Sequence, residues 1–299
     1  MNKGTSTSAI FWGFYLTIAF LPAETIFAQE KTGAIPNLSI PDSIHMQILI
    51  TKDGSANIGR IVEIKENEIQ FETDFGKVTI PISKIEEIKE VPISAFRDGK
   101  YWFPNPNATR LYFAPTARML EQGEGYFSDY YLFFPGIAYG MTDNITIGGG
   151  ISLFPGVDVN EQVFYFTSKV GLKATKDLNI AAGILLVKVP DESSTVGIFY
   201  GVSTYGTSDG SITAGFGYGF VDSDIAKKPM IMIGGEKRLS QRTAFVTENW
   251  IFPEVDQPLI SYGFRFFGER LSVDLALLNT IGEEAFFPGF PYIDFVANF

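Results

Sequence analysis

The stretch Tyr292-Ile293-Asp294-Phe295-Val296-Ala297-Asn298-Phe299 decides the fold that this sequence predicts. Its side chains alternate with a period of two, which is the period of a β-strand with two different faces. The apolar face consists of Ile293, Phe295, Ala297 and Phe299. The mostly polar face consists of Tyr292, Asp294, Val296 and Asn298.

A strand of this pattern that ends on an aromatic residue resembles the closing strand of bacterial outer-membrane β-barrels. In that superfamily, the assembly machinery of the outer membrane recognises alternating hydrophobic residues and a terminal Phe. The resemblance implies outer-membrane lipid and this machinery as partners, with Phe295, Ala297 and Phe299 as the candidate assembly signal. No specific functional family is indicated by these residues.

The composition supports a chain with much apolar surface. Aromatic residues make up 15% of the 299 residues, with 28 Phe and 13 Tyr, and charged residues only 19%. Soluble domains carry about 25% charged residues, so apolar surface must face something other than water. The absence of Cys excludes disulfides and thiolate chemistry. A net charge of -11 without a dense Lys/Arg stripe excludes nucleic acid as a partner.

The first 28 residues have the pattern of a cleaved secretory signal. Lys3 precedes an apolar core from Ala9 to Leu21, and Ala28 offers a small residue at the cleavage site. An apolar run of about 13 residues is too short to span a bilayer as a helix. An uncleaved anchor is the alternative, and cleavage after Ala23 is a less favoured variant.

A linker over 29–42 precedes a compact unit that we place at 43–94. Five short apolar alternations follow one another there, and the first ends at the turn Lys52-Asp53-Gly54-Ser55. The unit resembles SH3-like or Sm-like small barrels, and this fold-level pattern implies no particular binding partner. The residues that carry the resemblance are Asp53, Gly54, Ser55, Gly59, Ile61, Phe75, Gly76, Ile80, Pro81, Ile85 and Ile88.

After a second linker over 95–108, the chain from 109 to 299 predicts a transmembrane up-and-down barrel of about twelve antiparallel strands. The predicted strands are 109–119, 126–141, 145–154, 162–174, 178–189, 195–206, 211–220, 229–239, 243–252, 258–267, 270–279 and 291–299. Tight turns such as Thr142-Asp143-Asn144 follow the even strands. Longer segments, which include 120–125 and 281–290, follow the odd strands. This asymmetry is typical of outer-membrane barrels, whose short turns face the periplasm.

Side-chain alternation supports the membrane interpretation over a soluble barrel or sandwich, which needs polar outer faces. In 211–220 the residues Ser211, Thr213, Gly215, Gly217 and Gly219 face one way. The bulkier Ile212, Ala214, Phe216, Tyr218 and Phe220 face the other way. In 270–279, Ser272, Asp274 and Ala276 likewise oppose four aliphatic side chains. We expect the small and polar faces to line the lumen.

The same parity places six candidate lumen-lining residues: Tyr165, Lys169, Lys173, Arg265, Asp274 and Asp294. Such charges either line a solute path or pair with one another and fill the interior. Twelve strands do not decide between these, because eight are filled by side chains and sixteen leave a channel.

Glu248 does not fit this parity. It shares its face with Ala244, Val246 and Trp250, which we expect to meet lipid. A bulge near Thr247, or a position at the rim, would reconcile it.

The sequence contains no set of residues that would predict a catalytic or cofactor site. The single His45 lies in the small N-terminal unit, so Ser-His and Asp-His mechanisms cannot form in the barrel. Outer-membrane phospholipases and proteases of similar build need that His, and this chain departs from both. The glycines of 148–150 lie within a strand and precede no helix, which argues against phosphate binding. Acidic loops such as 158–161 match no calcium-loop spacing.

These observations predict an integral outer-membrane barrel, with the unit 43–94 and the C-terminus in the periplasm. We expect a narrow passive channel or a structural barrel. The alternative is an anchoring module, in which the unit 43–94 holds an envelope partner. We predict no enzymatic activity, no cofactor and no metal site.

Overall fold

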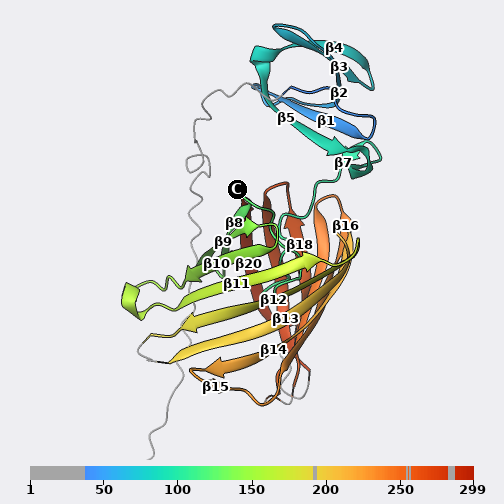
Figure 1. Ribbon diagram of the computed structural model, residues 1–299. Coiled ribbons are helices and arrows are strands. Elements are labelled where there is room, and N and C mark those ends of the chain that lie inside the picture. The colour runs from blue at the N-terminus through green and yellow to red at the C-terminus, as the bar shows by residue number, and fades with distance from the viewer. Residues whose placement is uncertain (1–37, 191–193, 254, 256, 282–286) are drawn as a thin grey trace, which may run out of the picture. The chain divides into compact units, whose positions relative to one another are not determined.

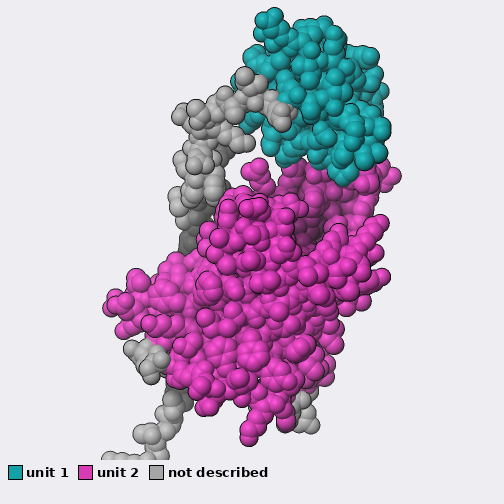
Figure 2. All heavy atoms as spheres, in the orientation of Figure 1, with its two compact units in different colours: residues 1–93 teal, residues 94–299 magenta. Residues whose placement is uncertain are grey.

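A computed structural model describes residues 38–190, 194–253, 255, 257–281 and 287–299. The chain divides into two compact units, residues 1–93 and 94–299 (Figure 2). The predicted signal over 1–28 and most of the linker over 29–42 lie outside the described residues. Among the described residues, no helix is long and apolar enough to cross a membrane.

The first unit is a five-stranded antiparallel sheet with the order β4-β3-β2-β1-β5. Its strands are β1 (His45–Thr51), β2 (Ala56–Ile64), β3 (Glu68–Thr73), β4 (Gly76–Pro81) and β5 (Ile85–Pro92). The buried core consists of Leu49, Ile61, Ile69, Phe71, Ile80 and Ile85. All five expected strands are present, while closure into an SH3-like or Sm-like barrel stays a prediction.

The residues that β1 buries are not all those of the apolar alternation that the sequence shows. Ile44, at the start of the apolar alternation, is 65% exposed, whereas Leu49 is fully buried. Gln47 is also buried, where its Oε1 accepts the Ile61 N–H and its Nε2 donates to the Ser39 carbonyl. A fully bonded glutamine can occupy a core position because its polar atoms have partners there.

The second unit contains a closed antiparallel barrel of twelve strands (Figure 1). The strands are β8 (Gly125–Tyr130), β9 (Phe134–Thr142), β10 (Ile145–Ile151), β11 (Phe164–Lys173), β12 (Leu178–Lys188), β13 (Thr195–Thr207), β14 (Gly210–Val221), β16 (Met230–Ser240), β17 (Thr243–Ile251), β18 (Leu259–Phe267), β19 (Leu271–Thr280) and β20 (Phe290–Asn298). A short β15 (Asp224–Ile225) extends β14, and β6 (Phe96–Arg97) pairs with β7 (Lys100–Tyr101) outside the barrel sheet. The structure therefore confirms the predicted fold class.

The barrel closes through β20 and β8, and here the predicted first strand is wrong. Residues 109–119 form no strand of the barrel, which begins at Gly125 instead. Asp294 lies opposite Tyr130 in the closing ladder, and the Phe299 N–H donates to the Gly125 carbonyl over 2.9 Å. The last strand thus finds a partner, but a later one than expected.

The predicted single strand 126–141 is also wrong, because it is two strands joined by a turn at 131–133. Tyr131 and Leu132 adopt positive φ angles of 54° and 66° there. Such angles are uncommon for residues other than Gly, Asn and Asp, so the sequence carries no turn signal at this point. One predicted strand, 109–119, is therefore missing and another is divided in two, so the total remains twelve.

The connections keep the expected asymmetry. The short ones over 143–144, 174–177, 208–209, 241–242 and 268–270 all lie at the end of the barrel that holds the C-terminus. Most connections at the opposite end are longer, and the turn 131–133 is the exception. The segment 120–125, expected as a long loop at that opposite end, instead leads into β8 at the short-turn end.

The outer face of the barrel is apolar, as the alternation in two strands predicted. In β14, Ile212 and Phe216 are 67% and 59% exposed, whereas Thr213 is fully buried. In β19, Leu275 is exposed and Asp274 is buried. In β17 the prediction was wrong: Ala244, Val246 and Glu248 are buried and face the interior, whereas Phe245 and Ile251 are exposed.

We predict a depth-dependent cost for a charge on this outer face. Phe216→Arg, at the middle of β14, should lower the free energy of unfolding by about 2–4 kcal/mol in a lipid bilayer. Ile212→Arg, near the short-turn end of the same strand and on the same face, should cost only about 0–1 kcal/mol, because its guanidinium reaches the interface. Unfolding by guanidinium chloride in lipid vesicles measures the free energy of unfolding of both variants. Equal costs for the two substitutions would contradict a lipid-facing surface.

Candidate functional site in the barrel lumen

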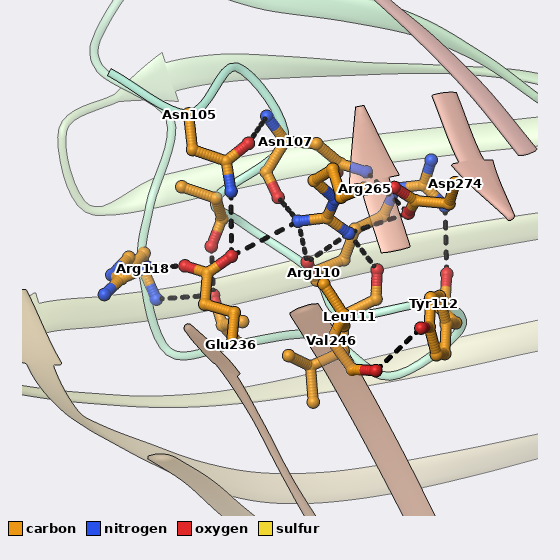
Figure 3. Close-up of polar contacts among 12 residues, drawn as sticks. Asn105, Asn107, Arg110, Leu111, Tyr112, Arg118, Glu236, Val246, Arg265 and Asp274 are labelled. Carbon is orange, nitrogen blue, oxygen red and sulfur yellow. Dashed lines mark hydrogen bonds and ion pairs between the residues drawn. The ribbon is translucent and has the colours of Figure 1, made fainter. Parts of the chain in front are cut away.

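The interior of the barrel is occupied by the lumen segment, which we define as residues 103–120. Its atoms hydrogen-bond to side chains of β10, β11, β13, β16, β17, β18 and β20. Partners on strands all round the ring place the segment inside the barrel, and Figure 3 shows part of this network. Leu111, Tyr112, Ala114 and Ala117 are fully buried there.

The segment folds back on itself in a tight turn. The Leu111 N–H donates to the Ala114 carbonyl over 2.8 Å, and the Thr116 N–H donates to the Thr109 carbonyl over 3.0 Å. This turn satisfies only some of its backbone groups. A buried stretch without regular structure needs partners for the rest, and here the barrel wall supplies them.

Arg265 of β18 is the most connected cation of this network (Figure 3). Its Nε and Nη2 donate to the two carboxylate oxygens of Asp274 over 2.7 and 2.8 Å. Nη1 donates to the Asn107 carbonyl over 2.6 Å and Nη2 to the Leu111 carbonyl over 2.7 Å. The side chain is fully buried. Its planar fork therefore joins a wall carboxylate to two points of the lumen segment.

Glu248 of β17 holds the turn of the lumen segment from the other side. Its Oε2 accepts the backbone N–H groups of Tyr112, Phe113 and Ala114 over 2.8, 3.0 and 2.9 Å. Its Oε1 accepts the Trp250 indole N–H over 2.7 Å. The ladder of β17 is regular at Glu248, so no bulge near Thr247 turns it inward. The whole strand has the opposite parity to the one expected.

Lys169 of β11 anchors the segment without a carboxylate. Its Nζ donates to the carbonyls of Thr109, Thr116 and Arg118 over 3.2, 2.9 and 2.7 Å. An ammonium group has three N–H donors, so these carbonyls satisfy it completely.

Two further ion pairs join the segment to the wall. Arg110 pairs with Asp294 of β20, and both side chains are buried. Arg118 pairs with Glu236 of β16 over 2.6 Å, and the same carboxylate accepts the Asn105 amide over 2.8 Å. Glu236, Arg265 and Asp274 lie toward the short-turn ends of their strands, whereas Glu248 lies toward the long-loop end of β17.

The structure brings four of the six predicted lumen residues to the lumen segment: Lys169, Arg265, Asp274 and Asp294. Tyr165 lines a cavity beside the segment. Lys173 is exposed at the end of β11 and joins none of these contacts. Ala297 and the half-buried Phe295 lie on the outer face of β20, and Phe299 is 59% exposed. Their role as an assembly signal stays a prediction.

Sequence reasoning missed the other half of the network. Glu236, Arg110, Arg118, Asn105 and Asn107 belong to it, together with Glu248, whose position was left open. A charged residue in an otherwise apolar strand was the available signal for Glu248. The segment itself was misread, because 109–119 was predicted to be the first strand of the barrel and the structure shows no strand there.

A cavity of about 550 Å³ lies between the lumen segment and the long-loop end of the barrel. Phe113, Ala114 and Pro115 of the segment form its floor. Its walls reach Val187, Met230 and other residues at the strand ends that lead into the long loops. Of the anchors described above, Arg110 and Lys169 line this cavity, whereas Glu236, Glu248, Arg265, Asp274 and Asp294 do not.

Metal and catalytic chemistry gain no support in the described part of the chain. No group of three His, Cys, Asp or Glu residues there is placed to hold a metal ion. His45 lies in the first unit, where its Nδ1 is 2.7 Å from Asp42 Oδ1, and this hydrogen bond lowers the pKa of Asp42. The glycines of β10 are paired in the ladder. The absence of enzymatic activity stays a prediction.

No described protein family and no curated protein matches this sequence. Solved structures similar to the chain include the KdgM porin, at 8% identity and a TM-score of 0.43 over 59% of this chain and 96% of that one. A loop-deletion mutant of OmpT, an outer membrane protein of Vibrio cholerae, matches at 12% identity and a TM-score of 0.32 over 86% and 96%. A mutant Rh. blastica porin matches at 10% identity and a TM-score of 0.33 over 85% and 97%. The closed barrel with an apolar outer face is by itself the architecture of an outer-membrane β-barrel.

We predict that Glu248 is essential for seating the lumen segment. Glu248→Ala leaves three buried N–H groups without their acceptor and should lower the free energy of unfolding by about 3 kcal/mol. Trypsin should then cut the folded barrel after Arg110 or Arg118, which the wild-type protein protects. Asn249→Ala, on the outer face of the same strand, is the control. Full protection of the Glu248→Ala protein would contradict this role.

Proposed function

We propose that this chain is an integral protein of the bacterial outer membrane, and that it is a narrow passive channel whose lumen is closed by its own residues 103–120. The observation that carries the proposal is the set of buried ion pairs and hydrogen bonds between this segment and the wall. The barrel has a structural role while the segment is seated and conducts only when the segment moves.

The outer face supports the membrane location. Large apolar side chains such as Val170 of β11 and Ile212 and Phe216 of β14 are exposed on the outer face of the wall. A water-soluble barrel would leave these side chains in water, at a cost of roughly 1.5–3 kcal/mol for each one. Lipid removes that cost, and a closed barrel leaves no unpaired strand edge within it.

The interior supports a closed state. Arg110, Arg265, Asp274, Asp294 and Glu248 are each at most 4% exposed, so the segment shields them from solvent. A hydrated ion crossing the barrel would have to displace these contacts. Removing one partner of a buried pair costs about 3–5 kcal/mol, which makes spontaneous opening rare.

The same interior supports a segment that can move. Asn107 Oδ1, Arg110 Nε and Asp294 Oδ1 are buried and have no hydrogen-bond partner among the described residues. Buried polar atoms of this kind are commonly satisfied by water. Water between the segment and the wall would replace hydrogen-bond partners while the segment moves, so that no buried charge is left without a partner.

The orientation and the partners follow as proposals. We place the short turns and the C-terminus in the periplasm, as in other outer-membrane barrels. The first unit, whose partner is unidentified, would then lie in the periplasm as well. An anchoring role for that unit stays a prediction, because no contact in the structure favours it.

Single-channel recording in planar bilayers tests the closed channel. The wild-type protein, checked for heat-modifiable migration, should give few or no openings. Glu236→Ala combined with Asp294→Ala removes the carboxylates that hold Arg118 and Arg110, and should give frequent openings. Glu161→Ala combined with Asp224→Ala removes two exposed acids and should behave as wild type. Steady wild-type conductance would contradict the closed state, and a silent double variant with a proteolytically released segment would contradict the channel.

A further inference from the structure

The cavity above the lumen segment differs in chemistry from the network below it. Aliphatic and thioether side chains form much of its wall: Leu185, Val187, Ile198, Val202, Met230 and Met232. The charged side chains that reach it are Arg110 and Lys169. A path for hydrated solutes is lined by polar groups that can replace the water around the solute. The surface of this cavity is mainly apolar.

The charged groups and the indole that line the cavity already have partners within the chain, and its other polar side-chain groups are the neutral hydroxyls of tyrosines and threonines. Lys169 Nζ donates to three carbonyls. Arg110 pairs with Asp294 and donates to the Tyr112 carbonyl over 3.0 Å. The Trp250 indole donates to Glu248. A charged ligand would find no free counter-charge here, so the cavity is suited to an uncharged guest.

The room in the cavity comes from the glycines of β14. Gly215 lies opposite Val202 and Met232, and Gly217 opposite Tyr200 and Met230, in the two neighbouring ladders. Both glycines line the cavity. Larger side chains at these lumen-facing positions would fill the space that now separates the wall from the lumen segment. A volume of about 550 Å³ lies within the range of small-molecule sites, roughly 300–1,000 Å³.

We propose that this cavity binds the hydrocarbon chain of an uncharged amphiphile. The chain enters from the long-loop end, its tail contacts Phe113 and the wall aliphatics, and its polar head stays in water at the mouth. Transfer of a hydrocarbon chain from water into an apolar cavity of this size is favourable. Water in such a cavity would find few hydrogen-bond partners and is easily displaced. The inference rests on the proposed function in one respect: the closing segment is the floor of the site.

Radiolabelled dodecanol is the probe. The full-length barrel in lipid nanodiscs, which are free of detergent, should retain one equivalent of dodecanol on gel filtration, above the amount that empty nanodiscs carry. Labelled maltotriose, a hydrophilic solute, should not be retained.

Two sets of variants locate the bound chain. Val187→Phe combined with Ile198→Phe fills the cavity and should abolish retention. Leu185→Asn combined with Met230→Gln keeps the volume but makes the wall polar, and should also abolish it. The matched control, Val170→Phe combined with Ile212→Phe, adds the same rings to exposed outer positions and should retain dodecanol as wild type.

Several results would overturn the site. These are no retention by the wild-type barrel, retention of maltotriose in place of dodecanol, or equal retention by the filled, polar and control variants. The last would show that the chain binds to the outer face. Each of these can occur while the wild-type protein remains silent in planar bilayers, so failure of the site is distinguishable from failure of the closed channel.

Discussion

The burial of Arg265 is the constraint on which the interior of the barrel depends. Its guanidinium is fully buried and has acceptors only when both Asp274 and the carbonyls of Asn107 and Leu111 are in place. A buried cation without acceptors costs several kcal/mol, so the wall and the lumen segment stabilise each other. Glu248 imposes the matching requirement from the neighbouring strand β17, because its carboxylate needs the N–H groups of the turn.

The lumen segment also explains how a twelve-stranded barrel copes with its width. Eight strands are filled by wall side chains, whereas twelve leave space that those side chains do not reach. Here the lumen segment fills part of that space and is held there by ion pairs and hydrogen bonds to the wall. A cavity lined mainly by apolar side chains remains beside it, and Arg110 and Lys169 belong both to the cavity wall and to the polar network.

Strand periodicity predicted the barrel well where each strand carries a clear contrast between its faces. β14 and β19 behave as expected, because small or polar residues alternate with large apolar ones. β17 does not, because Ala244 and Val246 are apolar yet buried against the lumen segment. Alternation distinguishes two faces, but an apolar interior makes the inner face resemble the outer one. The turn at 131–133 escaped notice for a separate reason, as Tyr131 and Leu132 adopt backbone angles that their residue types rarely take.

The sequence by itself determined the all-β class, the apolar outer face and the closing role of Tyr292 to Phe299. These follow from period-two alternation and turn chemistry, which are local properties of the chain. Only the tertiary structure decided what lies inside. Most of the lumen segment was predicted to be a strand of the wall, and its true partners are far away along the chain. Leu120 bonds to a residue 26 positions away, and Arg110 to one 184 positions away. Contacts of that separation exist only after the barrel closes, so the polar network and the cavity above it are properties of the closed fold.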